Sequence, residues 1–89
     1  MFNFLNSKSD EQIVKEIVYE EMIDAIDSIK KDMALFKTPL LINKFSDSHL
    51  RSARMFIEMR LSSINLKLSK EQIDKIVDDE GLRLLDKLL

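Results

Sequence analysis

The residues of this 89-residue chain that come closest to forming a chemical site are four carboxylates spaced three or four residues apart. They are Glu16, Glu20, Asp24 and Asp27. On a helix they share one face, as in carboxylate-bridged metal bundles, which also need a Glu-x-x-His pair on a facing helix. The single histidine is His49, and the residues from Asn43 to Ser46 offer no such acid. We therefore expect a solvated acidic face and no metal site.

Other catalytic equipment is scarce, because the chain has no cysteine, one glycine and one histidine. His49 follows Asp47 and Ser48, but neighbouring residues of a chain do not converge on one reacting atom as a catalytic triad does. One glycine cannot make a glycine-rich phosphate loop. The acids before Gly81 lack the alternating ligands of a calcium loop. The sequence predicts a protein that is not an enzyme and has no cofactor.

Charge is distributed unevenly along the chain. Residues 1–29 hold two basic and seven acidic side chains, residues 30–60 hold seven and three, and residues 61–89 hold five and six. The basic middle segment contains Lys44, Arg51, Arg54 and Arg60. These side chains either pair with the acidic first helix or face outward, where they would bind phosphate or an acidic partner.

Apolar spacing and capping signals predict the helices. Val14, Val18, Met22 and later apolar residues recur every three or four positions, which is typical of an amphipathic helix. Ser9 with Gln12, and Ser69 with Gln72, are spaced as capping boxes. Pro39 stops one helix and starts another, with Thr38 as N-cap. We expect helices at 9–35, 39–45, 47–65 and 70–88, with a break or kink near Asp47.

Together these elements predict one all-α domain over residues 1–89, in which residues 1–8 form a flexible N-terminal segment. Short connections make neighbouring helices antiparallel. The expected architecture is a small antiparallel bundle of three long helices plus one short helix. Gly81 marks a weak point in the last helix, either as its end or within it.

The first helix carries apolar residues outside its main stripe. They are Ile13, Ile17, Tyr19 and Ile23. Either neighbouring helices of the bundle cover them or they bind another chain. A short chain has little core to spare, and a two-fold axis needs only one self-complementary surface, so we expect a homodimer through this helix.

The function expected from these observations is that of a small protein-binding regulator, inhibitor or adaptor. The alternative is a nucleic-acid-binding module that uses the basic segment from Lys37 to Arg60. Missing signal-peptide and membrane-span patterns, and missing cysteine, favour a cytoplasmic protein. Ten lysines against four arginines are typical of AT-rich coding, as in phages and plasmids of low-GC bacteria.

Overall fold

The computed structural model describes residues 8–35 and 38–89, apart from the side chains of Ile42 and Phe45. It contains three helices, α1 at Asp10–Leu35, α2 at Pro39–Ser62 and α3 at Lys70–Leu88, and no strand within the described ranges. The all-α prediction is confirmed. The expected flexible segment lies outside the described residues except for Lys8.

Both predicted capping boxes are formed. At the start of α1, Ser9 Oγ accepts from the Gln12 backbone N at 3.2 Å, and Gln12 Oε1 accepts from the Ser9 N at 3.1 Å. At the start of α3, the corresponding distances between Ser69 and Gln72 are 3.1 Å and 2.9 Å. These reciprocal bonds satisfy backbone donors that a helix start leaves free, and they fix where the two helices begin.

The short helix expected at 39–45 and the helix expected at 47–65 are one continuous helix, α2. Asp47 does not cap a new helix: its Oδ2 accepts from Arg51 Nη2 at 3.0 Å, one turn further along the same helix. The polar residues around Asp47 therefore lie on a continuous helix and do not interrupt it. Thr38 is the N-cap and Pro39 begins the helix, as expected, but the Thr38 side chain makes no capping bond.

α3 likewise runs through Gly81 without a break. The Gly81 φ is not positive, so the residue has none of the left-handed geometry of a helix end. At the other boundary, α2 ends at Ser62, three residues earlier than expected, where the Ser63 N donates to the Arg60 O at 3.3 Å.

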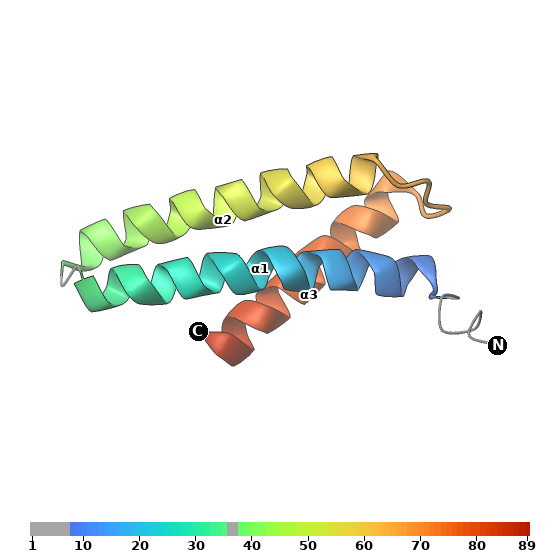
Figure 1. Ribbon diagram of the computed structural model, residues 1–89. Helices are drawn as coiled ribbons and strands as arrows, with labels where there is room; N and C mark the ends of the chain where they lie inside the picture. The colour runs from blue at the N-terminus through green and yellow to red at the C-terminus, as the bar shows by residue number, and fades with distance from the viewer. Residues whose placement is uncertain (1–7, 36–37) are drawn as a thin grey trace.

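α1 is the central helix of the bundle (Figure 1). α2 runs antiparallel along one side of it, and α3 crosses it on another side, moving away from α2 towards the C-terminus. α1 packs against both, whereas no Cα atoms of α2 and α3 in the described parts come within 8 Å of each other. The buried core includes Val14, Val18, Ile26 and Ile29 from α1, Ala53 and Ile57 from α2, and Val77 and Leu84 from α3.

The described helices hold no stretch with the length and apolarity that a membrane span requires.

Candidate functional site

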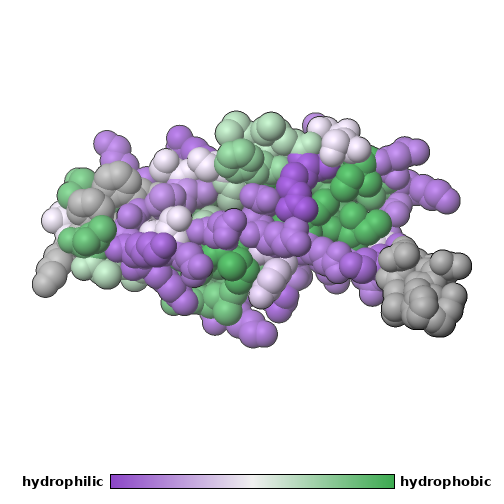
Figure 2. Space-filling model, viewed as in Figure 1, coloured by the Kyte–Doolittle hydropathy of each residue, from purple (hydrophilic) through white to green (hydrophobic). Residues whose placement is uncertain are grey.

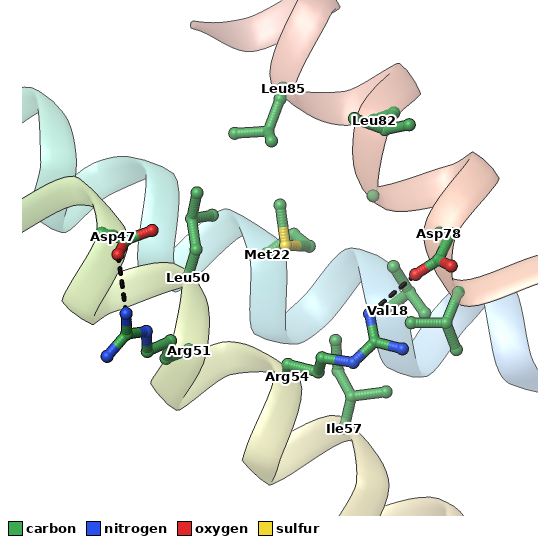
Figure 3. A pocket seen from close by; sticks show the side chains of 12 residues that line it. Val18, Met22, Asp47, Leu50, Arg51, Arg54, Ile57, Asp78, Leu82 and Leu85 are labelled. Carbon is green, nitrogen blue, oxygen red and sulfur yellow. Dashed lines mark hydrogen bonds and ion pairs between the residues drawn. The ribbon is translucent and has the colours of Figure 1, made fainter. Parts of the chain in front are cut away.

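A groove with a volume of about 280 Å³ lies between α2 and α3, where their backbones separate (Figure 3). Val18 and Met22 of α1 form its floor. One wall comes from α2 and the other from α3, and most of the wall side chains are apolar. They are Leu50 and Ile57 of α2, with Val77, Leu82 and Leu85 of α3. The three helices thus present one shared apolar trough.

An ion pair closes the narrow end of the groove. Arg54 Nη1 on α2 donates to Asp78 Oδ1 on α3 at 2.7 Å. This hydrogen bond is the main cause that raises the pKa of Arg54 above its ordinary value, against a smaller opposing effect of burial. At the other end, Leu50 of α2 and Leu85 of α3 stand on opposite sides of the groove (Figure 3). The groove therefore widens towards the N-terminal end of α2.

Further apolar side chains are exposed on the α3 wall and at the end of the molecule where α1 meets α2. Leu82 is 66% exposed on the α3 wall. α3 does not reach the end of the molecule where α1 meets α2 (Figure 1), and there Met33 of α1 is 48% exposed and Leu40 of α2 is 74% exposed. Exposed apolar side chains that gather in one patch often mark a binding surface.

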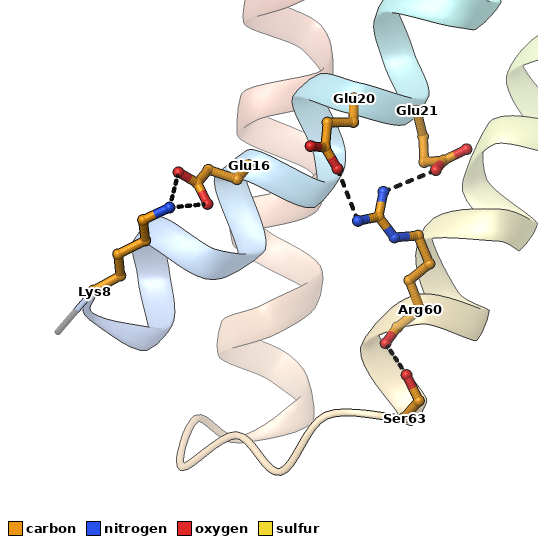
Figure 4. Close-up of polar contacts among 6 residues, drawn as sticks. All are labelled: Lys8, Glu16, Glu20, Glu21, Arg60 and Ser63. Carbon is orange, nitrogen blue, oxygen red and sulfur yellow. Dashed lines mark hydrogen bonds and ion pairs between the residues drawn. The ribbon is translucent and has the colours of Figure 1, made fainter. Parts of the chain in front are cut away.

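The basic segment of the sequence does not form one free patch. Arg60 reaches from α2 to α1, with Nη2 2.7 Å from Glu20 Oε1 and Nη1 2.9 Å from Glu21 Oε2 (Figure 4). The hydrogen bonds to Glu20 and Glu21 raise the pKa of Arg60. Of the two interpretations of this segment, pairing with the acidic first helix therefore holds for Arg60.

The other basic side chains of the segment are dispersed. Arg54 pairs with α3, as described above, and Arg51 pairs with Asp47 of its own helix. Lys44 is exposed near the start of α2. Of the binding residues expected from charge, only Arg51 and Arg54 line the groove.

Three of the four residues expected to form a self-association surface on the first helix are partly or fully covered. Ile17 is only 4% exposed and belongs to the core, so it offers no surface on the folded chain. Ile13 and Ile23 are half-buried, and Tyr19 is 50% exposed. The reason is the central place of α1: α2 and α3 pack on different sides of it and leave an outer strip whose exposed residues include Glu16, Glu20, Asp24 and Asp27.

Two of the acidic residues on that strip are engaged in ion pairs. Glu16 Oε1 lies 2.7 Å from Lys8 Nζ, and Glu20 pairs with Arg60 (Figure 4). No group of three or more potential metal ligands gathers anywhere in the described residues. His49, from α2, places Nε2 2.6 Å from Asp32 Oδ2 of α1, so it ties two helices together.

Sequence reasoning missed the α3 wall of the groove. Leu85 belongs to the same apolar stripe as the core residue Leu84, and nothing in that spacing separates a buried position from one beside an opening. Leu82 lies two residues before Leu84, outside that stripe, and the sequence offers no reason to select it. Comparison of the chain with protein-family models, with curated proteins and with solved structures found no match.

Proposed function

We propose that this protein is a small non-enzymatic binding module, acting as a regulator, inhibitor or adaptor, that takes an amphipathic helix of a partner protein into the groove between α2 and α3. The observation that carries this proposal is the apolar trough itself, which has a floor from α1 and walls from two helices that do not close over it.

The dimensions of the groove favour a helix over a small molecule. Its volume of about 280 Å³ is at the lower limit of the roughly 300–1,000 Å³ typical of small-molecule pockets. It is also open to solvent, and its wall residue Leu82 is 66% exposed. A helix in a groove uses such a surface, because apolar residues at i, i+3, i+4 and i+7 make one continuous stripe.

The charges at the rim give the partner helix a preferred composition. Arg51 lies on the α2 side with its side chain 82% exposed, and Asp78 lies on the α3 side. We expect the partner helix to carry an acidic residue beside its apolar stripe on the flank that faces Arg51. Such rim charges contribute mainly to orientation and association rate.

The test uses one groove variant and one matched control. Leu82→Glu places a charge on the α3 wall at a residue that is already 66% exposed, so the fold should survive. Tyr19→Glu places the same charge on α1, outside the groove, at a residue that is 50% exposed. Both variants and the wild type are immobilised, and proteins captured from a lysate of the native host are compared by mass spectrometry.

A specific partner should be retained by the wild type and by Tyr19→Glu and lost with Leu82→Glu. The purified partner, or a peptide from its binding helix, should then shift amide resonances of groove residues such as Val77 and Leu85. Equal capture by all three proteins, or resonance shifts confined to another face, would contradict binding in the groove.

A further inference from the structure

α2 has a face without charged side chains on the side away from the core, made of two methionines and three serines. Five exposed residues follow one another there at spacings of four, three, four and three: Ser48, Ser52, Met55, Met59 and Ser62. We refer to these five residues as the α2 seam. Met55 is 53% exposed and Met59 is 59% exposed, while the core residue Ile57 points to the opposite side. In Figure 2, apolar green atoms gather near the middle of the upper edge of the molecule, which α2 forms.

The α2 seam has the properties of a helix-packing surface. Alternating spacings of three and four place side chains along one line, as in two helices that pack along a common seam. None of the five residues is charged. The serines are small enough to let a second helix approach closely, and unbranched methionine side chains adapt their shape to a partner.

The two flanks of the seam carry different side chains, charged on one flank and aromatic on the other. This difference favours one kind of partner. Along one flank, Lys44, Arg51 and Glu58 follow at intervals of seven residues; Phe56 occupies the other flank and is 47% exposed. The Arg51 and Glu58 side chains are 82% and 65% exposed. The charged flank thus carries both signs of charge, seven residues apart, on one helix.

Of the two orientations of a second copy of α2, only the antiparallel one adds partners to these charges. Within the chain they pair along their own helix, Arg51 with Asp47 and Glu58 with Arg54. A two-fold axis beside Met55 reverses one helix, so that the charged flanks of both copies meet and Arg51 faces Glu58 of the second copy, twice. In a parallel pair, the charged flank would meet the flank that carries Phe56, and neither charge would gain a partner. The complementarity is therefore specific to one orientation.

We propose that a second copy of this chain packs antiparallel on the α2 seam and forms a two-fold symmetric dimer. This contact uses the face of α2 opposite the core and does not rest on the function proposed for the groove, although Arg51 borders both surfaces. The seam spans 15 residues of helix, or about 22 Å at 1.5 Å per residue. So short an interface is below standard size, and the dimer forms and dissociates with concentration.

The first experiment measures mass by sedimentation equilibrium at concentrations from about 1 μM to about 1 mM. The wild type should rise from the monomer mass of 10.4 kDa to twice that value. Met55→Glu/Met59→Glu should weaken dimerisation at least ten-fold with unchanged helical circular dichroism. Tyr19→Glu, on the α1 face once expected to pair, should dimerise like the wild type.

A wild type that stays monomeric across this range would overturn the proposal. So would a seam variant that dimerises as the wild type does, or a Tyr19→Glu variant that alone becomes monomeric.

The second experiment tests the orientation by charge reversal. Arg51→Glu alone sets two glutamates against each other at each contact, and Glu58→Arg alone sets two arginines against each other. Each variant should therefore dimerise more weakly than the wild type. Mixed together, they should form a heterodimer, because both contacts then join opposite charges. A mixture no more associated than its components would reject the antiparallel arrangement.

The third experiment uses the absence of cysteine from the chain. Met55→Cys lies beside the two-fold axis and should cross-link to itself under mild oxidation. Ser48→Cys should not, because the two copies of residue 48 are about 21 Å apart along the helices at 1.5 Å per residue. A mixture of Ser48→Cys with Ser62→Cys should cross-link, and self-linking of Ser48→Cys as efficient as that of Met55→Cys would contradict the register.

Discussion

Arg54 Nη1 on α2 and Asp78 Oδ1 on α3 lie 2.7 Å apart, across the narrow end of a groove that the two helices otherwise leave open. Among the described residues, the backbones of these helices make no close approach. The pair therefore links two helices whose relative position depends mainly on how each packs against α1.

The Arg54–Asp78 pair should contribute little to stability. Both side chains are about half exposed, so water screens their attraction. A double-mutant cycle with Arg54→Gln and Asp78→Asn should give a coupling energy below about 1 kcal/mol in chemical denaturation. The coupling should shrink further in high salt. A coupling of several kcal/mol that is insensitive to salt would show that the groove is closed in solution.

Two neighbouring leucines on α3 should respond very differently to substitution. Leu84 is 2% exposed and packs in the core, whereas Leu82 is 66% exposed on the wall of the groove. Leu84→Ala should lower the free energy of unfolding by about 2–5 kcal/mol, and Leu82→Ala by less than about 0.5 kcal/mol. Urea denaturation followed by circular dichroism measures both, and equal losses would mean that α3 is rotated about its axis.

The helix starts offer a second matched comparison. Ser69 Oγ accepts from the Gln72 N, whereas the Thr38 side chain makes no capping bond. Ser69→Ala should therefore destabilise the protein by about 0.5–2 kcal/mol, and Thr38→Ala by clearly less. Thermal unfolding of the two variants in one buffer compares them, and a larger loss for Thr38→Ala would contradict the capping geometry.

Gly81 should be replaceable by alanine with a gain in stability. It lies inside α3 with a negative φ, and an added Cβ would meet no atom within 4 Å. Glycine costs a helix interior about 0.5–1 kcal/mol relative to alanine, so Gly81→Ala should raise the free energy of unfolding by that amount. An unfolding midpoint lower than that of the wild type would indicate a neighbour at this position in solution.

Stability should fall in acid partly through Glu80. The hydrogen bond from Arg83, 2.6 Å between Nη2 and Oε2, lowers the pKa of Glu80 below its ordinary value. A carboxylate whose pKa is lower in the folded state stabilises fully above its unfolded pKa, about 4.3, and loses this contribution as pH falls through the folded value. Wild type and Glu80→Gln should therefore differ in stability at neutral pH and converge in acid.

Arg83→Gln removes the same pair from its other side and should show the same pH dependence in denaturant titrations. A difference between wild type and Glu80→Gln that stays constant from neutral pH to well below pH 4 would point to packing of the side chain and not to its charge.

Local signals predicted most of the fold. The two capping boxes correctly placed the starts of α1 and α3, because the bonds that form them join residues only three apart. The predicted division into two helices near Asp47 was wrong, because a polar run is equally typical of a helix start and of the wet face of a continuous helix. Only packing on α1 decides between the two, and local spacing does not report it.

The groove could not be predicted in the same way. It exists because α3 crosses α1 and diverges from α2, and no residue pattern within one helix sets the angle between two others. Arg54 illustrates the difficulty, since its partner Asp78 is 24 positions away. The partner of Arg60 was easier to foresee, because the acidic first helix offered the only large excess of opposite charge.

The central place of α1 also determines how the molecule opens. α1 supplies seven buried side chains, and α3 supplies two, Val77 and Leu84. Because α3 packs on α1 and not on α2, we expect it to detach while the hairpin of α1 and α2 remains folded. Amide hydrogens of α3 should exchange with solvent well before those at the middle of α1, so one of the two walls of the groove should also open before the rest of the fold.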